Sequence, residues 1–211
     1  MSASMQRTNI DVAGAPAAGS PPPPAQRRRH WALGWLAVIV IAGIVSVVLR
    51  LFVVQTFFVP SISMYPTLQM GDRILVQKID YSLQRGAIIV FQHPKLDTSP
   101  PLNEDLVKRI IGLPGETISS RGNTVYIDGK PLAEPWLPKG TQLGGQIVDV
   151  PGCATNATRG CVIPKGEYFM MGDNRSDSDD SRTWGPIPSS TFIGRVFLVV
   201  WRHGHPTFDV P

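Results

Sequence analysis

Histidine and cysteine are scarce in this chain of 211 residues, which contains four histidines and two cysteines. A structural zinc site needs four such ligands close together, and the sequence around Cys153 and Cys161 contains no histidine. We therefore expect no metal and no other cofactor. No Gly-x-Ser-x-Gly segment is present either, which excludes the nucleophile elbow of the α/β-hydrolases. The sequence has no internal repeat, and its length suits one soluble domain with an added sub-domain.

The folded part of the chain has no excess of basic residues. The formal net charge is +4, from 20 basic and 16 acidic residues. Residues 1–50 hold five of the basic residues and one acidic residue, so residues 51–211 hold fifteen of each. The excess positive charge therefore lies beside an apolar segment, which indicates membrane topology and argues against a nucleic-acid partner.

That apolar segment is long enough to cross a bilayer. Residues 1–30 are rich in proline and have few large apolar side chains, so we expect a disordered cytoplasmic tail there. Trp31–Leu49 has nineteen residues without a charge, and a helix of that length matches a bilayer core of about 30 Å. Arg27, Arg28 and Arg29 precede it and place the tail in the cytoplasm. We predict that residues 31–50 form a single transmembrane helix in the plasma membrane and that residues 51–211 lie outside the cytoplasm.

A cleavable secretory signal is the alternative to an anchor, because it also joins a basic region to an apolar stretch. The apolar stretch of such a signal is usually about 7–15 residues long. Here the run is longer, no small-x-small site follows it closely, and the next residues, 51–58, are mostly bulky. These features favour the anchor.

The two cysteines bracket a short loop of the predicted external part. In an oxidising compartment, Cys153 and Cys161 most simply form one disulfide. A loop of this size contributes at most about 2–3 kcal/mol to stability.

Residues 51–211 show short β-branched runs broken by glycine and proline and no sustained helical period, which predicts a mainly β domain. Asp128-Gly129 predicts a hairpin turn between Val125–Ile127 and Pro131–Leu132. Residues 131–165 hold five prolines and five glycines. We expect an irregular inserted sub-domain at about residues 117–165, between core segments at about 55–116 and 166–205. The predicted strands are Asp72–Ile79, Gly86–Gln92, Asp105–Ile111, Thr117–Ser119, Thr124–Ile127, Gln146–Val150, Tyr168–Met171 and Phe192–Trp201.

Ser63 closely follows the apolar segment, where a serine can act as a nucleophile at the membrane surface. A serine hydroxyl is a weak nucleophile at neutral pH, so this hypothesis requires a base and an oxyanion donor. Histidine is the common base, but His30 lies on the other side of the predicted membrane, and His203 and His205 lie in a Gly/Pro-rich tail. Only His93 remains, and a solvated or structural role is favoured for it.

Lysine can serve as the base where burial lowers its pKa from about 10.4 toward neutrality. In the predicted strand Asp105–Ile111, side-chain alternation places Lys108 on one face with Leu106 and Ile110. Its amine would then have two bulky apolar neighbours. The alternative is an exposed lysine at a strand edge, where this residue limits aggregation.

Short polar residues and two arginines gather in Gly172–Arg182, directly after an apolar strand. A solvated turn and a calcium loop are the alternatives here. The EF-hand pattern fails, because no glutamate stands at the twelfth position and no flanking helices are evident. Interleaved Asp and Arg suit a hydrogen-bonded network that fixes a neighbouring side chain. We expect a hydroxyl of this segment to orient Lys108.

Taken together, four segments resemble the bacterial type I signal peptidases, which are membrane-anchored Ser/Lys endopeptidases that remove signal peptides from exported proteins. The resemblance covers the anchor and the whole extracytoplasmic region. Its segments, in the family's order, are Pro60–Leu68, Gly71–Val76, Lys108–Gly115 and Gly172–Arg182. The resemblance implies a signal-peptidase-type antiparallel β-sheet core with an inserted irregular β sub-domain, preceded by one transmembrane helix.

The resemblance also implies roles for individual residues. Ser63 is then the acylated nucleophile and Lys108 the general base, while the Ser63 N–H and the Ser61 hydroxyl form the oxyanion hole. Ser178 falls where the family places a hydroxyl that holds the lysine. The implied ion pairs around the site involve Asp173, Asp180, Arg109 and Arg182. The implied pockets for small substrate side chains are lined by Phe57, Val59, Ile74, Leu106 and Val107.

Signal peptides of preproteins, cut after a small-x-small motif, are the implied substrates, and the lipid bilayer and the protein-export machinery are the implied partners. Two other classes of protein remain as alternatives. Self-cleaving Ser/Lys repressors share the catalytic pair, but they carry a DNA-binding domain, and this chain has no helix-turn-helix pattern. A non-enzymatic, membrane-anchored β-domain would release no product from a preprotein.

Overall fold

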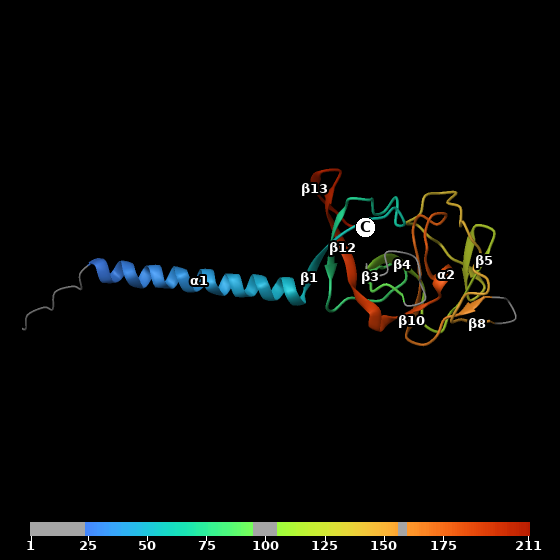
Figure 1. Ribbon diagram of the computed structural model, residues 1–211, viewed down its shortest axis with the longest axis horizontal. Coiled ribbons are helices and arrows are strands. Elements are labelled where there is room, and N and C mark those ends of the chain that lie inside the picture. The colour runs from blue at the N-terminus through green and yellow to red at the C-terminus, as the bar shows by residue number, and fades with distance from the viewer. Residues whose placement is uncertain (1–23, 95–104, 156–159) are drawn as a thin grey trace, which may run out of the picture. The chain divides into compact units, whose positions relative to one another are not determined.

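The computed structural model describes residues 24–94, 105–155 and 160–211. The chain divides into two compact units between Val45 and Ser46. Helix α1 runs over Pro24–Phe52 (Figure 1). Proline suits the first position of a helix, because the N–H that it lacks would have no partner there.

Helix α1 includes the helix predicted for residues 31–50. It also includes residues 24–30, which were predicted as part of the disordered tail; residues 1–23 of that tail lie outside the described residues. Within the part of the chain that the structure describes, no helix combines the length and the apolar character needed to cross a membrane. The membrane anchor stays a prediction.

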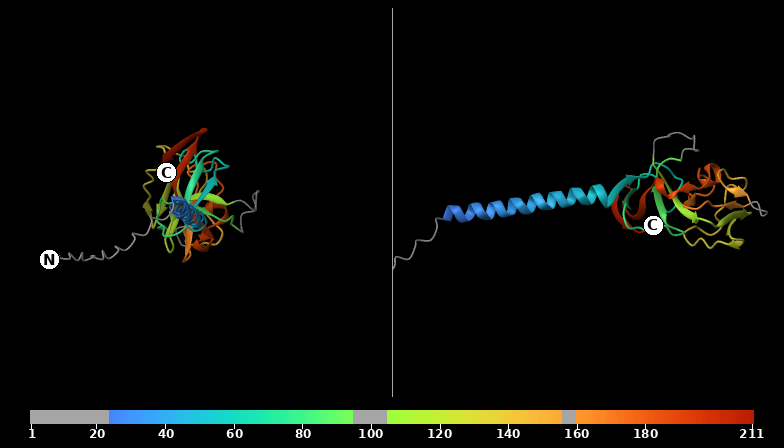
Figure 2. Two further views of the ribbon diagram at one scale, coloured as in Figure 1. Left: turned by 90° about the vertical axis from the view of Figure 1, so that its left-hand side faces the viewer. Right: turned by 90° about the horizontal axis from the view of Figure 1, so that it is seen from below.

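The second unit is built on an antiparallel sheet of eight strands, in the order β1-β2-β12-β3-β4-β10-β11, with β13 paired to β12. Strands β1 and β12 lie at one end of this unit, and β5 and β8 lie at the other (Figures 1 and 2). The strands of the large sheet are β1 (Val54–Phe58), β2 (Arg73–Gln77), β3 (Ile88–Phe91), β4 (Leu106–Gly112), β10 (Glu167–Met171), β11 (Ile187–Pro188), β12 (Phe192–Arg202) and β13 (His205–Asp209). The short helix α2 (Ser181–Trp184) and the 3₁₀ turn η1 (Ser189–Thr191) lie between β10 and β12 in the chain.

A second, five-stranded sheet has the order β7-β6-β5-β9-β8. Its strands are β5 (Thr117–Arg121), β6 (Thr124–Ile127), β7 (Lys130–Pro131), β8 (Ala154–Thr155) and β9 (Cys161–Val162). The predicted hairpin is confirmed, because Tyr126 pairs with Pro131 across a turn in which Asp128 and Gly129 both have positive φ. The predicted disulfide between Cys153 and Cys161 is also confirmed.

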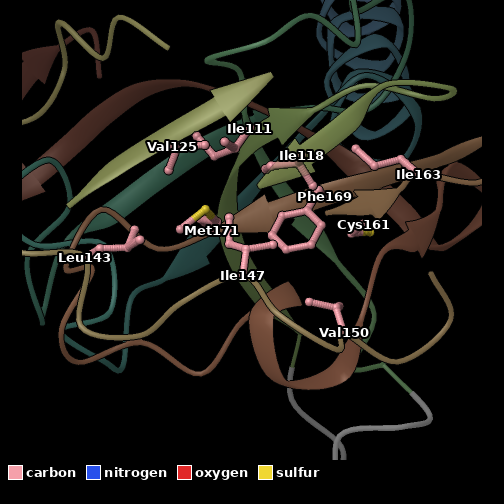
Figure 3. Packing of buried hydrophobic residues seen from close by; sticks show 10 residues of the cluster. All are labelled: Ile111, Ile118, Val125, Leu143, Ile147, Val150, Cys161, Ile163, Phe169 and Met171. Carbon is pink, nitrogen blue, oxygen red and sulfur yellow. The ribbon is translucent and has the colours of Figure 1, made fainter. Parts of the chain in front are cut away.

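The two sheets share a hydrophobic cluster (Figure 3). Phe169 and Met171 of β10 point from the large sheet into a group of buried side chains that come mainly from residues 118–163. At about 25 cal/mol per Å² of buried apolar area, such side chains each contribute about 1.5–3 kcal/mol. This packing fixes the described residues between β5 and β9 (122–155 and 160), hereafter called the insert, against β10.

The mainly β prediction is confirmed, and the strand predicted at Gln146–Val150 is wrong. Residues 141–150 form no strand. The Ile147 N–H donates to the Ser120 hydroxyl at 2.7 Å, so its partner is a side chain and not a neighbouring strand. The apolar pattern there reflects the burial of Ile147 and Val150 in the cluster of Figure 3. Strands β1, β8, β9, β11 and β13 were not predicted from the sequence, and β13 extends the large sheet beyond residue 205.

Candidate active site

Ser63 and Lys108 meet beside the large sheet. Ser63 lies in the loop between β1 and β2, and Lys108 lies on β4, which is flanked by β3 and β10. The Lys108 Nζ donates to the Ser63 Oγ at 2.7 Å. Ser63 is 9% exposed and Lys108 is 4% exposed, so the contact is shielded from water. A buried amine in hydrogen-bond contact with a hydroxyl has the geometry that proton transfer requires.

The two ends of the loop that carries Ser63 are joined by backbone hydrogen bonds. The Val59 N–H donates to the Asp72 carbonyl, and the Gly71 N–H donates to the Val59 carbonyl, both at 2.9 Å. Met64 and Leu68 are fully buried beneath the loop. These contacts fix the backbone on either side of Ser63.

Arg202 of β12 secures the same loop from the sheet. Its guanidinium donates to both carboxylate oxygens of Asp72, at distances of 2.7 to 3.2 Å, and to the Thr67 carbonyl at 2.9 Å. The hydrogen bond to Asp72 raises the pKa of Arg202. Arg202 therefore remains charged and joins the base of the loop to its middle.

Asn174 holds the backbone of the serine itself. Its N–H donates to the Ser63 carbonyl at 3.0 Å, and its side-chain amide donates to the Ile62 carbonyl at 3.2 Å. Asn174 lies in the polar segment after β10, so this segment contacts the Ser63 loop directly.

Arg109, which directly follows Lys108 in the chain, forms a buried ion pair with Asp173. The Arg109 Nε and Nη2 donate to the two Asp173 oxygens at 2.9 and 2.6 Å, and both side chains are nearly inaccessible to water. Thr67 donates to the same carboxylate, and the Arg109 Nη1 donates to the Gly86 carbonyl at 2.7 Å. The pair therefore ties β4 to the polar segment and to the serine loop.

Asp180 and Arg182 form the second ion pair of the polar segment. The Arg182 Nε and Nη2 each donate to Asp180 at 2.8 Å. Asp180 also caps α2 and accepts the Gly172 N–H at 3.1 Å. A Cβ added to Gly172 would overlap the Ser63 carbonyl oxygen and the Ser178 hydroxyl, so only glycine fits at this position.

Two other predicted residues border the pair. The Ser61 Oγ lies 3.2 Å from the Ser63 Oγ, near enough to assist an oxyanion at the attacked carbonyl. Ser178 lies beside Gly172 and donates to the Asp179 carbonyl at 3.5 Å. Its orienting action on Lys108 stays a prediction.

The family model described as "Signal peptidase, peptidase S26" matches residues 32–201 of this chain. The chain belongs to the signal peptidase family. It is 37% identical over 194 residues to signal peptidase I of Leptolyngbya laminosa. This match covers 88% of this chain and 85% of that relative. It is 34% identical over 180 residues to signal peptidase IB of Staphylococcus aureus strain Mu50, with 80% and 89% covered.

A crystal structure of a signal peptidase I from Enterococcus faecalis V583 is also similar to this chain. It has 32% sequence identity and a TM-score of 0.41, and the match covers 55% of this chain and 97% of that one.

Four of the five residues predicted to line substrate pockets belong to one cluster. Val59 and Ile74 are buried in it, and Phe57 and Val107 pack against it with part of their surface exposed. Leu106 packs against a different cluster, together with Ile110. The burial of Ile74 fits ordinary core packing, and the partly exposed side chains are the ones that remain accessible to a peptide.

Sequence reasoning missed several residues that hold the site of this signal peptidase family member. Four of them lie within the segments that carry the family resemblance, but each has its partner far away in the chain, so the sequence alone does not show which contact it makes. The missed residues are Thr67, Asp72, Glu134, Trp136, Asn174, Arg175 and Arg202. Among the described residues, no three His, Cys, Asp or Glu side chains form a group that could hold a metal ion.

Replacing Asp173 with Asn should lower the free energy of unfolding by about 3–5 kcal/mol, because the substitution leaves the buried Arg109 cation without its counter-charge. Urea unfolding measures this change. Asp209→Asn is the matched control, since the Asp209 side chain is 56% exposed and lies 3.5 Å from Arg202. Loss of the Asp209 charge should lower the free energy of unfolding by about 1 kcal/mol or less. Equal effects of the two substitutions would contradict the buried-pair assignment.

Proposed function

We propose that this protein is a membrane-anchored serine endopeptidase that removes signal peptides from exported preproteins, with Ser63 as nucleophile and Lys108 as general base. The observation that carries the proposal is the buried 2.7 Å contact between the Lys108 Nζ and the Ser63 Oγ. Membership of the signal peptidase family and the names of its relatives supply the reaction class and the substrate.

The reaction begins when the neutral Lys108 amine accepts the Ser63 proton as the Ser63 Oγ attacks the scissile carbonyl. This step needs a neutral amine, and the burial of Lys108, which is 4% exposed, disfavours a charged ammonium. The protonated amine then returns its proton to the leaving amino group, and an acyl-enzyme remains on Ser63. Water, deprotonated by Lys108, then attacks the acyl carbonyl. The bond to the Ser63 Oγ breaks, Lys108 returns the proton to this oxygen, and the signal peptide leaves with a new carboxyl group.

Ser61 and the Ser63 N–H stabilise the oxyanion of the tetrahedral intermediate. Ser61→Ala should lower kcat by about 10²–10³ and change KM little, because the donor acts on a charge that develops only in the transition state. Steady-state kinetics on a preprotein measure both constants. Ser61→Thr keeps a hydroxyl and should retain most of the activity. A Ser61→Ala enzyme with unchanged kcat would contradict this role.

The substrate is an extended peptide with small side chains at the first and third positions before the cut. Phe57 and Val107 offer partly exposed apolar surface from β1 and β4. Shallow apolar pockets accept alanine and exclude larger side chains, and pairing of the peptide backbone with a strand supplies affinity. These features support cleavage after small-x-small motifs.

Residues 31–49 supply the proposed anchor. The whole run, including positions whose side chains lie outside those described, carries no charge in the sequence. The described apolar side chains of α1 are exposed, and Ile39 is 65% exposed. The basic residues 27–29 support a cytoplasmic N-terminus, a single pass and a catalytic unit on the outer side of the plasma membrane. Export machinery would then deliver the substrate to the same surface.

Incubation of the purified full chain with a preprotein carrying Ala-x-Ala before its mature sequence tests the proposed function. The expected result is one cut directly after the second alanine, read by N-terminal sequencing of the product. A matched preprotein with bulky residues at the two alanine positions should remain intact. Absence of product from the first substrate would refute the peptidase and favour a binding domain.

A further inference from the structure

The insert contacts the active site through three arginines. Each arginine makes hydrogen bonds within the active site. The same guanidinium also contacts a residue of the insert. Trp136 lies against Arg109, Glu134 pairs with Arg175, and the Leu143 carbonyl accepts from Arg182.

Glu134 and Arg175 form a largely buried ion pair. The Arg175 Nη1 donates to Glu134 at 3.0 Å, its Nη2 donates to the other carboxylate oxygen, and the two side chains are 2% and 12% exposed. The Arg175 Nε donates to the Gly172 carbonyl at 3.0 Å. Arg175 directly follows Asn174, whose N–H holds the Ser63 carbonyl. Glu134 is therefore linked to the Ser63 loop through Arg175 and the adjacent Asn174.

Trp136 contacts Arg109, the arginine that adjoins the proposed base in the chain. The Arg109 guanidinium lies 5.1 Å from the centroid of the Trp136 ring, within the range of a cation–π interaction. The ring also packs over Gly86, whose carbonyl accepts from Arg109. Within the described part of the chain, the buried indole N–H has no hydrogen-bond partner, so ring packing and not a hydrogen bond explains the placement. Arg109 directly follows Lys108 on β4.

We propose that Glu134 and Trp136 are positioning residues, which fix Ser63 and Lys108 relative to each other by holding Arg175 and Arg109 from the insert. This inference rests on the proposed function. The insert can bear this role because Phe169 and Met171 of β10 are packed in its core (Figure 3). The insert also packs closely against the polar segment at Gly144, where an added Cβ would overlap the backbone of Arg175 and Ser176.

Glu134→Gln and Trp136→Leu test the proposal in the full-length enzyme. Each should lower kcat by about ten- to a hundredfold, because displacements near 1 Å in a catalytic pair have effects of that size. KM should change by less than about twofold, since the proposed substrate pockets are lined by residues of β1, β2, β4 and the start of the Ser63 loop and not by the insert. Trp136→Phe keeps an aromatic face for Arg109 and should restore most of kcat, which a purely volume-filling role does not predict.

Two matched variants control for damage to the insert and for loss of an ion pair. Tyr126→Leu removes an aromatic ring of the insert that lies 5.0 Å from Arg121 of β5. Glu116→Gln removes the carboxylate that pairs with Arg85 at 2.6 Å. Both should leave kcat within about twofold of the unmodified enzyme. Thermal unfolding identifies variants that fail to fold, and Trp136→Leu decides the matter alone if Glu134→Gln is one of them.

The outcomes separate this inference from the function on which it rests. An active unmodified enzyme, with kcat for Glu134→Gln and Trp136→Leu no lower than for the two controls, would overturn the positioning role and leave the peptidase intact. Equal kcat values for Trp136→Leu and Trp136→Phe would overturn the cation–π part. Lack of cleavage by the unmodified enzyme would overturn the proposed function, and the positioning role with it.

Discussion

Ser63→Ala should abolish cleavage of an Ala-x-Ala preprotein while the protein stays folded. Loss of the nucleophile in other serine peptidases lowers kcat on the order of 10⁶-fold, so product should fall below detection. The substitution removes one oxygen from a residue that is 9% exposed, and the surrounding loop keeps its own hydrogen bonds, including Asn174 N–H to the Ser63 carbonyl. The melting temperature should therefore change by only a few degrees.

Two measurements make this result specific to the hydroxyl of Ser63. Mass spectrometry of acid-quenched reactions should detect an acyl adduct on the unmodified enzyme and none on Ser63→Ala. Ser82→Ala is a suitable control, because the Ser82 hydroxyl accepts from Arg195 in an exposed contact at 3.3 Å, and its loss should leave cleavage unchanged. Cleavage by Ser63→Ala at a rate near that of the control would remove Ser63 from the mechanism.

The catalytic pair is the part of the site that sequence reasoning reaches most directly. A serine placed after an apolar segment needs a base, and the strand alternation that sets Lys108 between Leu106 and Ile110 supplies a lysine with apolar neighbours. The structure places the Lys108 Nζ and the Ser63 Oγ 2.7 Å apart although the two residues are 45 positions apart in the chain. In the structure Leu106 and Ile110 pack in one cluster, as the alternation requires.

The insert is the part that sequence reasoning does not reach. Its prolines and glycines predict an irregular segment, but irregular segments lack the periodicity that indicates which side chains point inward. The strand wrongly predicted at Gln146–Val150 and the missed pair of Glu134 with Arg175 share this cause. Both depend on contacts between segments that are far apart in the chain, which only the folded backbone brings together.

Arginine is suited to the linking role that it has in this site. A guanidinium offers five donors in a planar fork and remains charged, so one side chain can bind a carboxylate with one edge and a backbone carbonyl or an aromatic ring with the rest. Arg109 binds Asp173, the Gly86 carbonyl and the Trp136 ring at once. Lysine, with a single ammonium group, could not make these contacts together.

Lys108→Met should also abolish cleavage, and it tests the base rather than the nucleophile. Methionine has a similar length and no amine, so the side chain can fill the same buried space. Loss of a general base lowers turnover by about 10²–10⁴, and here no product should accumulate on the time scale of the unmodified enzyme. The activity of the unmodified enzyme should itself fall as the pH is lowered, because protonation of Lys108 removes the base. Steady-state rates across a pH series measure this dependence.

Lys108→Arg distinguishes a base from a structural cation. Arginine keeps the positive charge and the hydrogen-bond donors, but it does not lose its proton at any pH at which the protein is folded. An enzyme that needs only a cation beside Ser63 would retain activity with arginine, whereas one that needs a neutral amine would not. Lys130, which is exposed on β7, gives the matched control, and Lys130→Met should cleave at the unmodified rate. Substantial cleavage by Lys108→Arg would therefore reassign the base of this reaction to another group.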